Sequence, residues 1–102
     1  MFKVLGAIKR HKDVPFDEFK QWWFDVHAPR VKQWPGLTRY HINLAVSEHE
    51  EFDGIAEIWF DSERAARDVF DTPEGRSARS ALNDDVARVV VFVAEEHVIV
   101  AD

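Results

Sequence analysis

The sequence predicts an α+β fold whose elements follow the order strand, helix, strand, strand, helix, strand. Two observations support this order: short apolar runs with a period of two, and segments whose apolar residues recur every three or four positions. In addition, no linker, repeat or low-complexity segment interrupts the 102 residues. Because 46% of the residues are apolar and 31% are charged, the composition is that of a globular chain. We therefore expect one domain over residues 1–102.

The first strand is predicted over residues 2–9, which alternate between two faces, neither of them clearly polar. A helix is expected to open at residues 12–15, because a proline is tolerated in the first turn, and Asp13 is one possible cap. The apolar stripe of this helix is expected to consist of Phe16, Phe19, Trp23 and Val26.

His27 lies beside that stripe and is therefore expected to point inward. Two residues later, Pro29 has no N–H to donate to the carbonyl of Asp25. The helix must therefore kink or restart around His27 and Ala28.

Two strands that pair as a hairpin are predicted over residues 37–46 and 54–60, with a polar loop between them. Each strand has two distinct faces. On the earlier strand, Tyr40, Ile42 and Leu44 share one face, and His41 and Asn43 share the other. On the later strand, Ala56, Ile58 and Phe60 lie opposite Ile55, Glu57 and Trp59.

The second helix is expected to be capped by Asp61 or Ser62 and to restart as a second segment at residues 72–74. Residues 88–94 then form a strand that is apolar on both faces, and residues 98–100 add a short extended tail. The core face of the second helix is expected to carry Ala65, Ala66, Val69 and Phe70.

This element order matches the ferredoxin-like split βαβ arrangement, in which two helices cover one face of a four-stranded sheet. The strands are apolar on both sides, so the open face needs a cover as well. A second copy of the chain is the simplest one. We therefore expect a homodimer in which two sheets face each other as a dimeric α+β barrel.

Composition and charge exclude several classes of function. The net charge is −6 and no cluster of Lys or Arg stands clear of the acidic residues, so we expect no nucleic-acid partner. No apolar run is long enough for a signal peptide or a membrane span, and there is no cysteine, so we expect a cytoplasmic protein without a membrane partner. No His-x-His or His-x3-His spacing favours a metal, and no Gly-rich phosphate loop or Ser nucleophile motif is present. We therefore predict neither a metal nor a cofactor.

Four segments together resemble a known family: residues 27–29 (His-Ala-Pro), 35–40 (Pro-Gly-Leu-Thr-Arg-Tyr), 52–61 and 92–96. Through them nearly the whole chain resembles the EthD family. The resemblance implies the dimeric α+β barrel fold. Members of that family include a cofactor-free methylmuconolactone methylisomerase, fungal polyketide dehydratases or decarboxylases, and proteins of ether degradation.

The resemblance also implies site residues. His27 matches the active-site histidine of the family, and Tyr40 matches the aromatic hydroxyl of the second strand. The methylisomerase has a further histidine in the loop after that strand, for which His49, in a shorter loop, is only a loose counterpart.

The chemistry of the two side chains suits catalysis by proton transfer. An imidazole has an ordinary pKa of about 6.5, and burial holds it neutral, so His27 is the candidate base. A phenol with a pKa of about 10 is a good donor, so Tyr40 could polarise a carbonyl or stabilise an enolate. Apart from the resemblance, His27 also fits a structural hydrogen-bonding role, and Tyr40 fits a core position.

Four further residues are candidates for substrate binding: Trp23, His41, Glu57 and Trp59. If the strand face of Glu57 and Trp59 meets His27, Glu57 could orient the imidazole and Trp59 could wall the pocket. Alternatively, Glu57 pairs with Arg39 across the hairpin, and the tryptophans belong to the core or an interface. Asp84 could approach the pocket rim.

These observations favour a cofactor-independent acid/base enzyme of the isomerase, dehydratase or cyclase type. Its substrate would be a small hydrophobic carbonyl, lactone or phenolic compound, and proton transfer of this kind supplies about 10²–10⁴-fold acceleration. Two alternatives remain open: a non-catalytic protein that binds a degradation intermediate or supports a partner oxygenase, and a cofactor-free monooxygenase.

Overall fold

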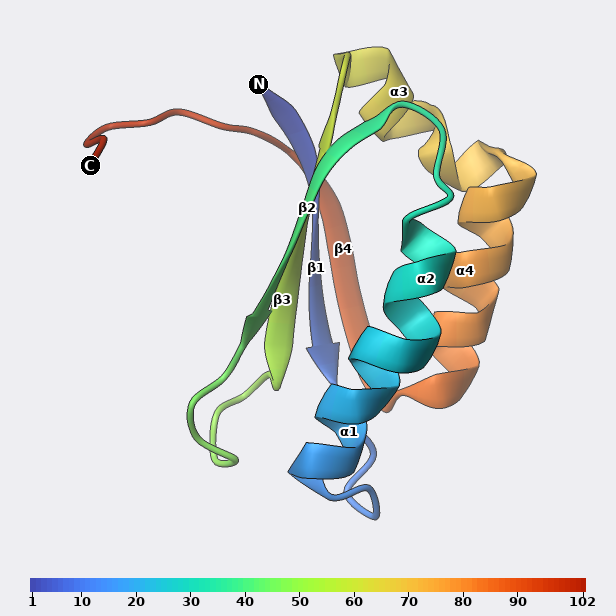
Figure 1. Ribbon diagram of the computed structural model, residues 1–102, viewed down its shortest axis with the longest axis vertical. Coiled ribbons are helices and arrows are strands. Elements are labelled where there is room, and N and C mark those ends of the chain that lie inside the picture. Colours follow the sequence, from blue (N-terminus) through green and yellow to red (C-terminus); the bar gives the residue numbers. More distant parts are fainter.

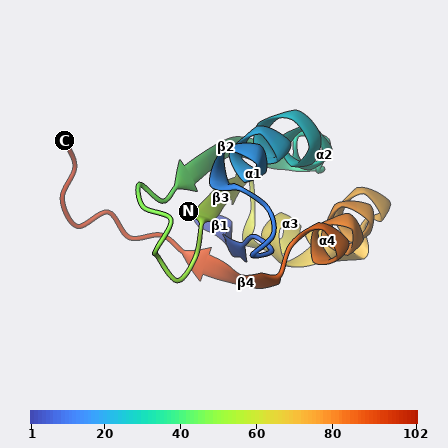
Figure 2. The ribbon, with the colours of Figure 1, turned by 90° about the horizontal axis from the view of Figure 1, so that it is seen from below.

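The computed structural model describes all residues from 1 to 102 and consists of one sheet with helices on one face (Figures 1 and 2). The sheet contains four antiparallel strands in the spatial order β2-β3-β1-β4. The strands are β1 (Phe2–Lys9), β2 (Leu37–Leu44), β3 (Gly54–Phe60) and β4 (Arg88–Glu95). The predicted α+β fold is confirmed.

The helical layer has two arms, each broken as the sequence predicts. The first arm is α1 (Phe16–Trp22), a π-helical turn (Trp23–His27) and α2 (Ala28–Val31). The second arm is α3 (Glu63–Asp68), a 3₁₀ turn (Val69–Asp71) and α4 (Pro73–Asp85). Ser62 caps α3 and Thr72 caps α4 through their hydroxyl groups. No side chain caps α1, so the suggestion of Asp13 as a cap is wrong.

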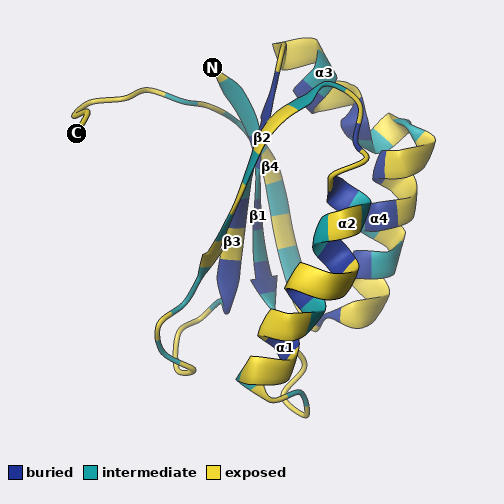
Figure 3. Cartoon of the chain, viewed as in Figure 1, coloured by how far each residue is buried: buried dark blue, intermediate teal, exposed yellow.

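The core lies between the helices and the inner face of the sheet (Figure 3). Alternation along the strands is as predicted, because Ala56, Ile58 and Phe60 on β3 are buried against the helices. The expected stripe of the first arm is wrong at one position, since Val26 is 40% exposed. A π-helical turn has more residues per turn than an α-helix. After buried Trp23 it therefore brings His27, rather than Val26, to the inner side.

The outer face of the sheet carries exposed apolar side chains on β3 and β4. Ile55 and Val90 are each at least 40% exposed, and Phe92 is 55% exposed. After β4 the chain leaves the sheet as an extended tail in which Val98, Ile99 and Val100 are exposed (Figure 1). None of the helices combines the length and the apolar character that a membrane crossing requires.

Trp23 packs over the start of β3 because position 54 is a glycine. A Cβ atom at Gly54 would lie 2.6 Å from Cζ3 of Trp23 and 2.7 Å from the carbonyl oxygen of Asn43. Neither atom belongs to a flexible group that could move aside at little energy. Gly54 is therefore required where the indole of Trp23 meets the strand.

We expect Gly54→Ala to lower the free energy of unfolding by about 1–3 kcal/mol, because the added methyl group overpacks this contact. Urea unfolding measures the change. Gly6→Ala is the matched control, because a Cβ atom at position 6 would lie 3.9 and 4.0 Å from its nearest neighbours, which is an ordinary contact distance. Equal stabilities of the two variants would contradict the requirement for glycine at position 54.

Candidate functional site

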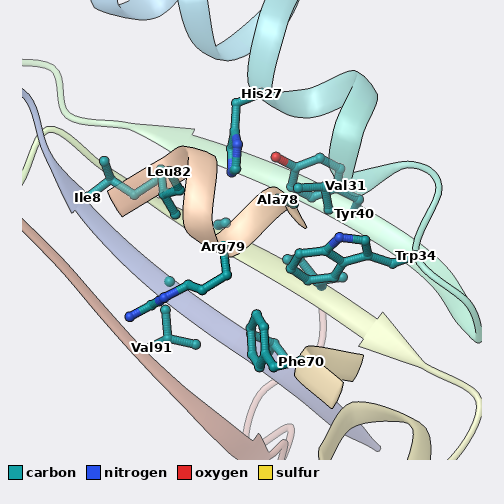
Figure 4. Close-up of a pocket in the computed structure, with 14 residues that line it drawn as sticks. Ile8, His27, Val31, Trp34, Tyr40, Phe70, Ala78, Arg79, Leu82 and Val91 are labelled. Atoms are coloured by element: carbon teal, nitrogen blue, oxygen red, sulfur yellow. The ribbon is translucent and has the colours of Figure 1, made fainter. Parts of the chain in front are cut away.

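A small cavity of about 30 Å³ lies between the first helical arm, α4 and the inner face of the sheet (Figure 4). Its volume is on the order of that of one water molecule. Its walls are mostly apolar, and they include Ile8, Val31, Ile58, Ala78 and Leu82. The polar side chains in the lining are His27, Trp34, Tyr40 and Arg79. The site therefore has few polar groups within an apolar shell, as small-molecule sites commonly do.

His27 points into this cavity from the π-helical turn (Figure 4). Only 4% of the residue is exposed, and its Nδ1 atom has no hydrogen-bond partner. Desolvation by burial lowers the pKa of His27 to about 4, the charge of Arg30 acts in the same direction, and Asp85 opposes both. This lowered pKa agrees with the expectation that burial holds the imidazole neutral. At neutral pH His27 therefore has one ring nitrogen free to accept a proton.

The ring of His27 is positioned by stacking. It lies parallel to the indole of Trp22, with 5.3 Å between ring centroids and 7° between the planes. Asp85 of α4 accepts hydrogen bonds from Trp22 Nε1 at 3.2 Å and from Arg30 Nη1 at 3.3 Å. Asp85 thus links α4 to Trp22, against which the imidazole of His27 stacks.

Tyr40 reaches the same cavity from β2 (Figure 4). Its hydroxyl oxygen accepts a hydrogen bond from Trp23 Nε1 at 2.9 Å. Burial raises the pKa of Tyr40 to about 12, while the hydrogen bond from Trp23 acts in the opposite direction. The hydroxyl is therefore a neutral donor whose proton is free for a ligand. Trp23 itself is fully buried and does not line the cavity, so it supports the phenol through this hydrogen bond.

An irregularity at the start of β2 allows Leu37 and Tyr40, which are three residues apart, to face inward together. The pairing with β3 shifts between Leu37 and Arg39, so Thr38 is an extra residue in the strand. Such a bulge changes which side chains face each side. After it, Tyr40 lies opposite Ile58 on the inner face, as the alternation predicts.

Three of the sequence-predicted candidates lie on the outer face of the sheet, away from His27. Glu57 accepts hydrogen bonds there from Lys3 at 2.9 Å and from Asn43 at 2.9 Å, and the bond from Lys3 is the main cause that lowers its pKa. The strand face of Glu57 therefore does not meet His27, and Glu57 does not orient the imidazole. The alternative pair between Glu57 and Arg39 is also wrong, because Lys3 takes that place.

Trp59 and His41 belong to the same outer cluster. Trp59 is buried beneath Lys3 and Arg39, whose charged groups lie 4.7 and 4.6 Å from its ring centroid. His41 packs edge-on against Trp59 and accepts a hydrogen bond from Arg39 at 3.0 Å. Neither residue lines the His27 cavity, because strand alternation directs both side chains to the other face. His49 and Asp84 are exposed and do not reach the cavity either.

Arg79 and Trp34 line the cavity but were not predicted as site residues. Arg79 lies on α4 one position after Ala78, which together with Gly75 and Leu82 forms the buried stripe of that helix. A helical projection of residues 73–85 could have identified it as an arginine beside an inward stripe. For Trp34 no sequence signal distinguishes a cavity position from an ordinary core position.

This geometry defines a ferredoxin-like α+β protein with a buried histidine and a half-buried tyrosine between the sheet and the helices. The model of the EthD domain matches residues 11–92 of the sequence. The chain belongs to the EthD family. No curated protein matches the sequence significantly.

Solved structures share the whole fold at low sequence identity. An EthD family protein from Bacillus halodurans superposes with a TM-score of 0.78 at 19% identity, over 95% of this chain and 99% of that chain. A dimeric ferredoxin-like protein of unknown function from Thermobifida fusca has a TM-score of 0.69 at 17% identity, with coverages of 91% and 88%. A candidate antibiotic biosynthesis monooxygenase from Nitrosomonas europaea has a TM-score of 0.63 at 14% identity, with coverages of 94% and 98%.

Proposed function

We propose that this protein is a cofactor-independent acid/base enzyme that acts on a small hydrophobic compound with a carbonyl, lactone or phenol group. The observation that supports this proposal is the pairing of two groups in one apolar cavity. His27 supplies an unpartnered, buried Nδ1, and Tyr40 supplies a hydroxyl proton. A base beside a donor is the arrangement that enolisation needs.

In the proposed reaction, His27 Nδ1 removes a proton from the carbon next to the carbonyl of the substrate. The electron pair of that C–H bond moves onto the carbonyl oxygen, which accepts a hydrogen bond from the hydroxyl of Tyr40. His27 then returns the proton, either to another carbon, which completes an isomerisation, or to a departing oxygen, which completes an elimination. Because the depressed pKa makes His27 a weak base, the substrate needs an acidic C–H bond.

Proton exchange in heavy water tests this mechanism directly. Small lactones, enols and hydroxy-ketones are incubated with the protein in D₂O, and loss of the proton next to the carbonyl is followed by NMR. We expect one class to exchange, His27→Ala to slow exchange by about 10²–10⁴-fold and Tyr40→Phe to slow it by about 10²-fold.

His97→Ala is the matched control, because His97 is an exposed histidine outside the cavity, and we expect it to exchange at the wild-type rate. Exchange that persists in His27→Ala, or compounds that bind and do not exchange, would overturn the proposal. Binding without exchange would support the non-catalytic alternative.

We further propose that the protein is a homodimer that pairs through the outer face of the sheet. The exposed side chains of Ile55, Val90 and Phe92 on that face support this proposal, as does the dimeric relative from Thermobifida fusca. Light scattering on the same samples checks the mass, which should be twice 11.9 kDa. A monomer at micromolar concentration would contradict the dimer.

A further inference from the structure

The buried polar atoms that lack a partner all belong to residues of one cavity. In the whole chain, three buried side-chain nitrogen or oxygen atoms make no hydrogen bond: Nδ1 of His27, Nε1 of Trp34 and Nη1 of Arg79. All three residues line the cavity shown in Figure 4. Buried polar groups in native proteins are almost always hydrogen-bonded. Their convergence on one space marks a place where a bound molecule would supply the missing partners.

Arg79 determines the charge of that ligand. Its guanidinium forms no ion pair with any carboxylate of the chain, whereas most of the other arginines form one. Asp85, the carboxylate that contacts the His27 side of this site, already binds Arg30 and Trp22. An arginine that is half-buried among apolar walls without a counterion is unfavourable by itself. A negatively charged group of the ligand would remove that penalty.

The positions of the polar groups separate the two ends of the ligand. Tyr40 comes from β2, and Arg79 lies beside Val91 of β4, and these two strands are the opposite edges of the sheet. Edge strands separated by two others are roughly 14 Å apart, a distance that inward side chains shorten. In Figure 4, His27 points into the space between Tyr40 and Arg79. The charged group of the ligand is therefore several bonds away from the oxygen that Tyr40 would hold.

The surface beside Arg79 provides room for such a molecule. A second pocket of about 360 Å³ is lined by Phe70, Arg79 and Val91, which also line the inner cavity, together with Phe92 and Val93. The inner cavity alone, at about 30 Å³, is too small for a substrate. Arg79 stands at the boundary of the two spaces, where it can bind the outer end of a ligand whose reacting end lies inside.

We propose that the substrate is a carboxylic acid whose carboxylate is bound by Arg79 and whose carbonyl lies at the other end of the cavity, next to Tyr40. This inference rests on the proposed function and specifies its substrate class. A carboxylate fits better than a phosphate, because it carries one negative charge that a single guanidinium neutralises, through two parallel N–H···O bonds. Trp34 Nε1 is left to donate to a further oxygen of the same ligand.

Matched acids and esters test the charge requirement. The probe is 3-benzoylpropionate, an aromatic keto acid, compared with its neutral methyl ester, and binding is measured by calorimetry. We expect the acid to bind the wild-type protein about 10–100-fold more tightly than the ester, as a charged hydrogen bond allows. Arg79→Gln should remove this preference and leave the affinity for the ester unchanged.

Two further variants keep the test independent of folding. Arg79→Lys preserves the positive charge and should retain part of the preference for the acid. Arg76→Gln removes an exposed arginine from the same helix and should retain all of it. Equal binding of acid and ester by the wild-type protein, or an unchanged preference in Arg79→Gln, would overturn the inference.

Proton exchange in D₂O separates this inference from the proposed function. If neutral ketones exchange as fast as keto acids in a His27-dependent reaction, the acid/base enzyme stands and the carboxylate inference fails. If the acid binds through Arg79 and no compound exchanges, the carboxylate site stands and the proposed reaction fails.

Discussion

Replacement of Asp53 by alanine is expected to lower the free energy of unfolding by about 3–5 kcal/mol, since it removes one partner of a buried ion pair. The side chain of Asp53 is 1% exposed and accepts hydrogen bonds from the backbone N–H of Arg10, at 2.8 Å, and from its guanidinium. The ammonium of Lys9 lies 3.7 Å away. These contacts join the end of β1 to the residue before β3. Without the carboxylate, a partly buried guanidinium would lose its counterion.

Urea unfolding of three variants separates charge from hydrogen bonding at Asp53. Asp53→Asn keeps an oxygen that can accept the backbone N–H of Arg10 but removes the charge, so its loss of stability should lie below that of Asp53→Ala. Glu51→Ala breaks an exposed ion pair with Arg88 and should change the free energy of unfolding by less than about 0.5 kcal/mol. A similarly small change in Asp53→Ala would show that the ion pair does not hold the two strands together.

Much of the fold follows from local patterns in the sequence. Apolar alternation correctly assigns the inner faces of β2 and β3, because burial of one face constrains every second residue. The break in the first helical arm was also predictable, since Pro29 cannot donate to Asp25. The form of that break was not predictable. A kink, a restart and a π-helical turn are all compatible with the missing N–H of Pro29. The structure has the π-helical turn, in which Val26 is exposed and His27 is buried.

The site was predictable only where the chemistry of a single residue identifies it. His27 and Tyr40 were proposed from their side chains, their neighbouring elements and the resemblance to the EthD family, and both line the cavity. Glu57 and Trp59 were correctly grouped on one face. Which face meets His27 depends on which side the helices cover, and that is a long-range property of the packing. Arg79 was missed because an arginine on a helix usually forms an ion pair or faces solvent, and its lack of a partner exists only in three dimensions.

The stability of the protein is expected to fall by about 2–3 kcal/mol between pH 7.5 and pH 4.5 because of His27 alone. The folded state holds the pKa of His27 at about 4, below the ordinary value of 6.5. Between these values the unfolded chain binds a proton at this residue and the folded chain does not. The contribution to stability is therefore complete above pH 6.5 and is lost as the pH falls toward 4. Each unit of difference corresponds to about 1.4 kcal/mol.

The pH range of this loss distinguishes the titration of His27 from that of carboxylates whose pKa is lowered. The bond from Lys3 lowers the pKa of Glu57 from 4.5, so its stabilising effect is present above pH 4.5 and is lost below it. A loss of stability that begins near pH 6.5 therefore belongs to a histidine. Urea unfolding at intervals from pH 7.5 to 4.5, with wild-type protein and His27→Gln, measures the difference. We expect the wild-type curve to fall and the His27→Gln curve to be nearly flat over this range.

The same experiment bears on the proposed chemistry, because both depend on a desolvated imidazole. If the two proteins lose stability in parallel, His27 titrates in the folded state as it does in the unfolded chain, and the cavity then contains enough water to solvate its charge. A hydrated imidazole would have its Nδ1 bonded to solvent rather than free for a substrate. A flat His27→Gln curve beside a falling wild-type curve would instead identify His27 as a neutral base that is kept dry by Trp22 and the apolar walls around it.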